Sequence, residues 1–291
     1  MHPAPSVILF TVLSGMGFGL LMFLGAGLIQ PEGWPAFWHW GLGYGLAVVG
    51  LLASTAHLGN PQRALLAFTQ WRSSWLSREA WASLAALVCL APMALSDWLG
   101  LGWPRVVGFV GAGLAITTIF CTAMIYAQMA TVPRWNTRMT LFLYFAFACA
   151  GGSILAAEGM IARAALGILL VLMLLEFSRG DKRFAARAHS MATATGLGQI
   201  GTLSVFEHPH TGDNYLMREM IYVVARRHAL KLRVIAVWCA AAVPLALIIV
   251  LPATAVTFAL AAMSHLAGAL VARWLFFAEA EHVVGLYYGK R

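Results

Sequence analysis

Two residues able to exchange protons lie at the two ends of one polar segment. The run HLGNPQRALLAF begins at His57, and the run WRSSWLSRE ends at Glu79. Apolar stretches flank this segment, so a helical hairpin would bring His57 and Glu79 to the same end of a bundle. Histidine titrates near neutral pH, and a carboxyl group in such a position can relay protons to water.

A membrane quinone is a ligand that could exchange protons with these side chains. Its carbonyl oxygens need a hydrogen-bond donor that also delivers or removes a proton, as a histidine can. Arginine and tryptophan flank an apolar ring at the depth of the lipid headgroups. The candidates for quinone binding or proton relay are His57, Arg63, Trp71, Arg72, Trp75 and Glu79.

A structural interpretation of the same segment stays open. His57 can cap the carbonyls of a helix end, Ser77 can be an N-cap, and Glu79 suits a helix N-terminus. The tryptophans suit an aromatic belt at the membrane surface. Residue types and spacing do not separate this interpretation from the quinone interpretation.

The last apolar run also contains polar residues. His265 falls near its middle, Arg273 about two turns later, and Glu279 and His282 near its end. Arg273 is long enough to reach the membrane surface, whereas His265 is not. We expect a neutral His265 that hydrogen-bonds a carbonyl of a neighbouring helix, and we expect Glu279 and His282 at the interface.

Two further groups of polar residues are weaker evidence for a functional site. A polar seam in the fourth apolar run can line a cavity or hold helices together, and we favour the second role; its residues are Thr117, Thr118, Cys121, Thr122 and Tyr126. The pair His208 and His210 has no third ligand at a usual spacing. Each of the four cysteines lies alone inside an apolar run, so we expect no metal, iron–sulfur or disulfide site.

Composition indicates a membrane protein. Of 291 residues, 61% are hydrophobic and 10% are charged, whereas soluble domains carry about a quarter charged residues. Eight stretches are long enough to cross a bilayer: 6–28, 38–58, 79–98, 105–128, 139–157, 160–177, 232–252 and 254–279. We therefore predict one all-α membrane domain, 1–291, of eight transmembrane helices, with no signal peptide at its start.

The basic residues predict the topology. If the chain crosses the membrane eight times, sixteen lysines and arginines lie on the same side as both termini, and two lie on the other side. The remaining one, Arg273, lies inside a span. The positive-inside rule therefore predicts cytoplasmic termini. It also explains the net charge of +8 without nucleic acid as a partner. The long cytoplasmic segment 178–231 is expected to end in an interfacial helix, which is either a linker on the lipid surface or a docking surface.

At this point a family resemblance is visible. The runs HLGNPQRALLAF and WRSSWLSRE resemble the signature of the dimethyl sulfoxide reductase membrane-anchor family, and YAQMATVPRW (126–135) resembles its fourth helix end. The segment EHPHTGDNYLMREM (207–220) is more similar to the anchors of cytoplasmic-facing sulfite dehydrogenases. The resemblance extends over nearly the whole chain.

The resemblance implies a role in a complex. Family members sit in the bacterial cytoplasmic membrane and anchor an iron–sulfur subunit and a molybdopterin catalytic subunit, here on the cytoplasmic side. They exchange electrons with ubiquinone or menaquinone, in general without haem, and are not catalytic alone. The family's important histidine and glutamate match His57 and Glu79. Docking of the partner is assigned to Arg78, Arg134 and Arg218.

Other functions remain open. A small-molecule transporter also has polar positions and glycine-rich helices, such as Gly15 to Gly27, but paired broken helices are not evident. A cytochrome b needs two histidines at matching depths, and His39, His57 and His265 do not match. A reductase anchor would pass electrons in the opposite direction. The sequence determines neither this direction nor the quinone.

Overall fold

The computed structural model describes residues 3–57, 60–207, 212, 220 and 228–288. Within these ranges the regular structure is helical, and eight segments are long and apolar enough to cross a membrane. Six are the helices α1 (Pro5–Gly25), α2 (Trp34–Ala53), α3 (Trp75–Leu99), α4 (Val106–Ala127), α5 (Arg138–Leu155) and α6 (Gly159–Arg179). The seventh joins α10 (Ala229–Val237), η5 (Trp238–Ala242) and α11 (Val243–Val250), and the eighth is α12 (Ala255–Ala278). The predicted all-α fold and its eight candidate spans are confirmed.

Short helices lie between and after these spans. Two of them, η1 (Ser54–His57) and η2 (Pro61–Phe68), belong to the connection between α2 and α3. The others are η3 (Gly180–Lys182), α7 (Arg183–Ala186), α8 (Met191–Thr195) and η6 (Val283–Tyr288). Most of the expected interfacial helix at 214–233 falls outside the described residues, and α10 begins at Ala229.

The start of α3 differs from the prediction. The helix begins at Trp75, and the hydroxyl oxygen of Ser74 accepts a hydrogen bond from the Ser77 backbone N–H at 3.5 Å. Ser74 is therefore the N-cap, so the assignment of this role to Ser77 is wrong. As a consequence Glu79 lies one turn inside the helix and not at its first residue.

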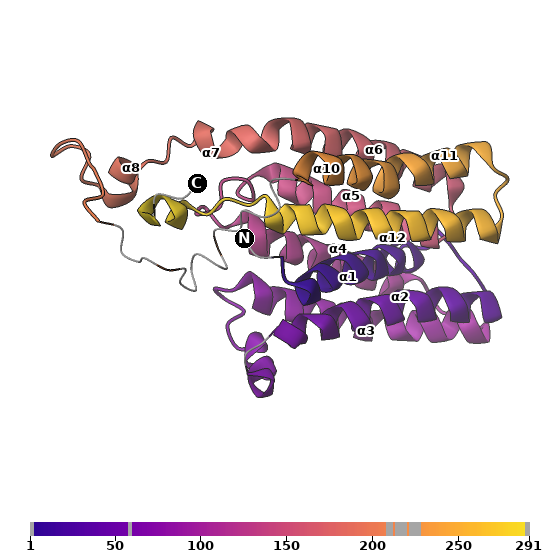
Figure 1. The fold of residues 1–291 in the computed structure, drawn as a ribbon. Coiled ribbons are helices and arrows are strands. Elements are labelled where there is room, and N and C mark those ends of the chain that lie inside the picture. Colours follow the sequence, from indigo (N-terminus) through magenta and orange to yellow (C-terminus); the bar gives the residue numbers. More distant parts are fainter. Residues whose placement is uncertain (1–2, 58–59, 208–211, 213–219, 221–227, 289–291) are drawn as a thin grey trace.

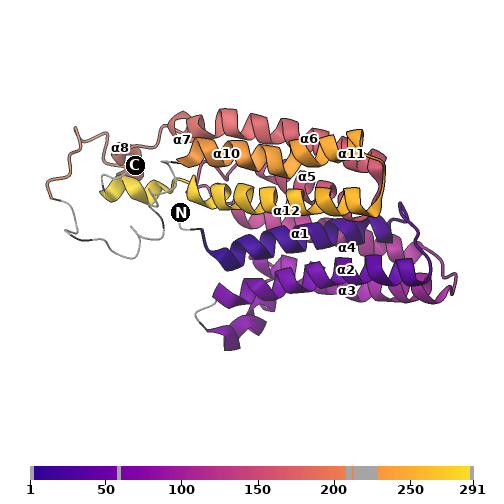
Figure 2. The same ribbon diagram turned by 45° about the vertical axis from the view of Figure 1, so that its right-hand side comes forward.

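The helix α1 is the most buried span and lies at the centre of the bundle. It packs against α2, α4, α5 and α12, and Figures 1 and 2 show it between the group α2 to α4 and the later helices. A Cβ atom on Gly19 would lie 2.0 Å from the Ala148 carbonyl oxygen of α5. This glycine therefore allows close packing of two helices, which is a common role of small residues in membranes.

Both chain ends lie at the same end of the bundle (Figure 1). The η1–η2 connection, the segment after α6 and η6 are also at this end, which we call the terminal end. The turn between α1 and α2 and the turn between α3 and α4 lie at the opposite end. The predicted hairpin that carries His57 and Glu79 therefore belongs to the terminal end.

Candidate functional site

Glu79 points into the bundle. Its side chain is 3% exposed, and the hydroxyl of Thr122 in α4 contacts its Oε1 atom. The same hydroxyl lies 3.0 Å from the Thr118 carbonyl oxygen. Within the described residues no arginine, lysine or histidine forms an ion pair with Glu79. Glu79 is thus a buried carboxyl group with a neutral partner.

The connection between α2 and α3 folds over the start of α3 and is tied to it by three side chains. Ser77 donates a hydrogen bond to the Ala67 carbonyl, and Trp81 Nε1 donates to the Phe68 carbonyl at 2.9 Å. Arg78 donates to the carbonyls of Trp71 and Arg72, at 3.0 and 2.7 Å. These bonds satisfy backbone carbonyls that an irregular segment leaves without partners.

The other predicted quinone residues lie on this folded segment or, in the case of Trp75, at the first residue of α3. Trp71 is 55% exposed, and Arg63 and Arg72 are also exposed. Trp75 is half-buried and meets the Phe120 ring edge to face, with 5.7 Å between centroids. His57 is the last residue of η1, and its side chain lies outside the described part of the chain.

A second group of charged residues closes the terminal end between α5, α6, α10 and α12. We call it the ion-pair cluster, and its residues are Arg134, Glu176, Asp181, Arg183, Arg233 and Glu279. Arg134 Nη2 lies 2.6 Å from Glu279 Oε2, and Arg233 Nε lies 2.6 Å from Glu279 Oε1. Arg134 and Arg233 also share Asp181, at 2.9 and 2.5 Å. Glu279 therefore lies between two guanidinium groups.

The predicted docking residues have different surroundings. Arg134 is 9% exposed and is bound within the chain, so its effect on a partner would act through the loop that it holds. Arg78 lies over the Trp75 ring at 4.3 Å and holds the neighbouring backbone. Arg218 lies outside the described residues. Docking by these arginines stays a prediction.

His265 and Arg273 of α12 are both buried. His265 Nδ1 lies 2.6 Å from the Ala240 carbonyl oxygen, which confirms the expected bond to a neighbouring helix. Pro244, four residues after Ala240, has no N–H to donate to that carbonyl. Arg273 does not reach the surface: it is 6% exposed, and its guanidinium lies 3.9 Å from the centroid of the Tyr144 ring.

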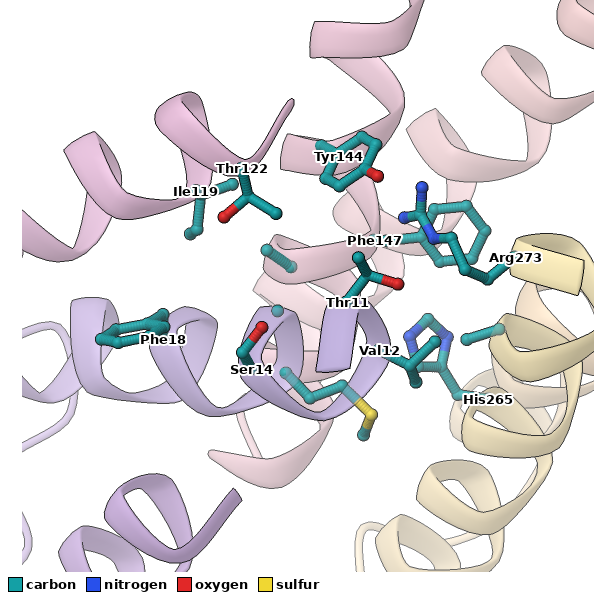
Figure 3. Close-up of a pocket in the computed structure, with 14 residues that line it drawn as sticks. Thr11, Val12, Ser14, Phe18, Ile119, Thr122, Tyr144, Phe147, His265 and Arg273 are labelled. Carbon is teal, nitrogen blue, oxygen red and sulfur yellow. The ribbon is translucent and has the colours of Figure 1, made fainter. Parts of the chain in front are cut away.

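Two internal cavities adjoin Arg273. The central cavity lies between α1, α4, α5 and α12, encloses about 20 Å³ and is lined by Thr122, Tyr144, His265 and Arg273 among others (Figure 3). The end cavity encloses about 40 Å³ and is lined by Tyr144, Arg273, Arg134 and Glu279 among others. Because Tyr144 and Arg273 line both, they form part of the wall between the two spaces.

Sequence reasoning missed two of these features. The polar seam was interpreted as helix packing, yet its Thr122 contacts Glu79 and lines the central cavity. The ion-pair cluster was also missed, because its residues come from four segments that lie 42 or more positions apart. A usable signal was present: Arg134 and Glu279 each lie close to the predicted terminal end of a span. The pair His208 and His210 lies outside the described residues.

Comparison with known proteins gives a family and one relative. The family model for the DMSO reductase anchor subunit (DmsC) matches residues 1–289. A sulfite dehydrogenase subunit of Allochromatium vinosum is 29% identical, and the alignment covers 99% of each chain. No solved structure shows significant similarity to this chain.

Proposed function

The chain belongs to the DMSO reductase anchor subunit family, and from this premise we propose that it passes electrons between an iron–sulfur partner and the membrane quinone pool. It anchors a molybdoenzyme complex in the membrane and is not catalytic alone. We further propose that sulfite is the electron donor of the complex, because the relative named above is a sulfite dehydrogenase subunit that aligns with this chain over 99% of both lengths. Electrons then flow from the partner towards quinone.

The observation that carries this proposal is the environment of Glu79. A buried carboxyl group inside a membrane is costly and is a functional candidate by default. Among the residues that the structure describes, Glu79 has a threonine as its partner and no cation, so no salt bridge there holds it in one protonation state. Within the described residues, its Oε2 atom has no hydrogen bond. A carboxyl group of this kind can give up a proton and take one back.

The surrounding residues fit a quinone. A bound quinone would accept two electrons and two protons and so become a quinol. Glu79 would hold a carbonyl oxygen through Oε2, and the ring of the half-buried Trp75 offers an apolar face nearby. His57, Arg63, Trp71 and Arg72 belong to the segment that covers this site, and we assign them to quinone binding as well. We propose no haem, iron–sulfur cluster or metal in this chain.

The basic end of the bundle suits the partners. We propose that the terminal end faces the bacterial cytoplasm, since it carries most of the arginines and lysines. The iron–sulfur and molybdopterin subunits would then dock on the side where Glu79 lies. This arrangement keeps the electron path from cluster to quinone short.

One purification tests the proposal. The tagged chain is isolated from its own membranes in mild detergent, and molybdenum, iron and sulfite-dependent reduction of a short-chain ubiquinone are measured. We expect both metals to copurify, and we expect Glu79→Gln to lower quinone reduction about a hundredfold, the lower end of what a positioned acid or base contributes.

The control is Glu32→Gln, which changes an exposed carboxylate between α1 and α2 at the opposite end. It should turn over as the unchanged complex does. A metal-free chain would contradict the anchor role. A complex in which Glu79→Gln reduces quinone at the full rate would contradict the quinone site.

A further inference from the structure

Thr122 is placed to take part in proton transfer. A threonine hydroxyl has one proton, yet its oxygen contacts both Glu79 Oε1 and the Thr118 carbonyl oxygen. The Thr118 carbonyl can only accept, so when Thr122 donates to it, a protonated Glu79 must donate to Thr122. When Glu79 is ionised, Thr122 turns and donates to the carboxylate. The same two contacts therefore serve both forms of Glu79.

The central cavity on the other side of Thr122 is suited to water. A cavity of about 10–15 Å³ or more can hold a water molecule if polar groups line it, and this one encloses about 20 Å³. Two of its polar atoms, the Tyr144 hydroxyl and His265 Nε2, are buried and make no hydrogen bond of normal geometry among the described residues, although Tyr126 and the Phe147 backbone lie near them. His265 is 0% exposed, and its Nδ1 proton is used by Ala240, so Nε2 needs a donor. Buried groups of this kind usually bind ordered water.

Arg273 gives a second reason to expect water. Its guanidinium has five N–H donors, but in the described part of the chain its contacts are the faces of Tyr144, Phe147 and Phe276. No carboxylate there lies within 4.0 Å of it. A buried cation without an anion needs other hydrogen-bond acceptors. The two cavities that Arg273 lines are where water can supply them.

The end cavity continues this series of polar groups to the terminal end. It is lined by Arg273 and Tyr144 at one side and by Glu279, Glu176 and Arg134 at the other. Arg134 and Glu279 also line a surface hollow beside Asp181 and Arg233. Polar groups thus extend from Glu79 through Thr122 and both cavities to the aqueous surface.

Building on the proposed function, we propose that Thr122 and water in these two cavities form the path by which Glu79 regains its proton. In the reaction Glu79 gives its carboxyl proton to a quinone oxygen, while the electrons come from the iron–sulfur partner. Thr122 then passes its hydroxyl proton to Glu79 Oε1 and takes one from cavity water, and rotation of the carboxyl group turns the new proton towards the quinone. Water at the terminal end replaces that proton, and two such cycles supply the two protons that one quinone takes up with two electrons.

The test measures exchange of the Glu79 proton directly, without quinone. The intact complex is transferred into D₂O, and the carboxyl stretching band of Glu79, identified by its loss in Glu79→Gln, is followed by infrared spectroscopy. We expect Thr122→Val, which keeps the shape and removes the hydroxyl, to slow exchange about tenfold. Quinone reduction should fall by a similar factor with an unchanged KM, as expected when a proton relay is removed.

The matched control is Thr118→Val, one turn earlier on α4. Its hydroxyl is buried too but bonds the Leu114 carbonyl at 2.9 Å and does not line the central cavity. Tyr144→Phe removes a hydroxyl that makes no hydrogen bond of normal geometry among the described residues and should slow exchange several-fold. Equal exchange rates in Thr122→Val and Thr118→Val would overturn the path. If Glu79→Gln reduces quinone normally, the proposed quinone site fails, but the exchange rates still report on the path.

Discussion

Two buried glutamates near the terminal end, Glu79 and Glu279, have opposite surroundings. Glu279 forms ion pairs with two guanidinium groups, each at 2.6 Å. Glu79 has one hydroxyl as its partner. Both side chains are at least nine-tenths buried, so the difference lies in their partners and not in their access to solvent.

This difference separates a carboxylate held by ion pairs from the one that we propose to be reactive. Glu279 lies against two cations, and removing its carboxylate would leave Arg134 and Arg233 less compensated. Glu279 therefore joins the end of α12 to the loop after α4 and to α10. Glu79 has no such constraint, so its protonation can change during a reaction without breaking an ion pair.

The largest effect on stability is expected for Glu279→Gln. Removing one member of a buried ion pair costs about 3–5 kcal/mol, because the remaining charges stay buried. Asp181 still compensates both arginines, so we expect the lower end, about 3 kcal/mol. The measurement is reversible unfolding of the purified complex in mixed micelles.

Glu79→Gln is the matched comparison for this prediction. The amide keeps a hydrogen bond to Thr122, so the free energy of unfolding should change by less than about 1 kcal/mol. Equal losses of stability in the two variants would remove the distinction between the two glutamates.

A smaller change in the free energy of unfolding, towards higher stability, is expected for Arg273→Met. Arg273 is buried like Arg134 but has aromatic faces in place of carboxylates. The substitution loses cation–π attraction of about 1–2 kcal/mol and removes a larger desolvation cost. We expect unfolding free energy to stay unchanged or to rise by about 1 kcal/mol. A loss above about 2 kcal/mol would show that an anion pairs with Arg273.

The sequence predicted the fold better than the site for physical reasons. Runs of about twenty apolar residues specify spans because the bilayer leaves few other structures possible. His265 was also predicted correctly, since a mid-span histidine cannot reach water and must find a carbonyl. Its acceptor is on another helix and could not be assigned from spacing.

The missed contacts depend on how helices face one another. Thr122 and Glu79 are 43 residues apart, and their meeting follows from the rotation of α4 against α3. Hydropathy carries no information on this rotation, because both helices are apolar around most of their circumference. Arg273 was expected to be able to reach the surface, but Tyr144 and Phe276 hold it inside.

The smallest loss of stability is expected for a substitution of Arg105, at the end of the bundle opposite the terminal end. There Arg105 Nη2 pairs with Asp97 Oδ1 at 3.0 Å, and Trp40 Nε1 also donates to Asp97, at 3.1 Å. Arg105 is 23% exposed, so water can reach the pair and weakens its attraction. Arg105→Gln should therefore cost at most about 1 kcal/mol in the same unfolding assay. A loss as large as that of Glu279→Gln would mean that ion pairs at both ends hold the bundle equally, and the ion-pair cluster would then have no special structural role.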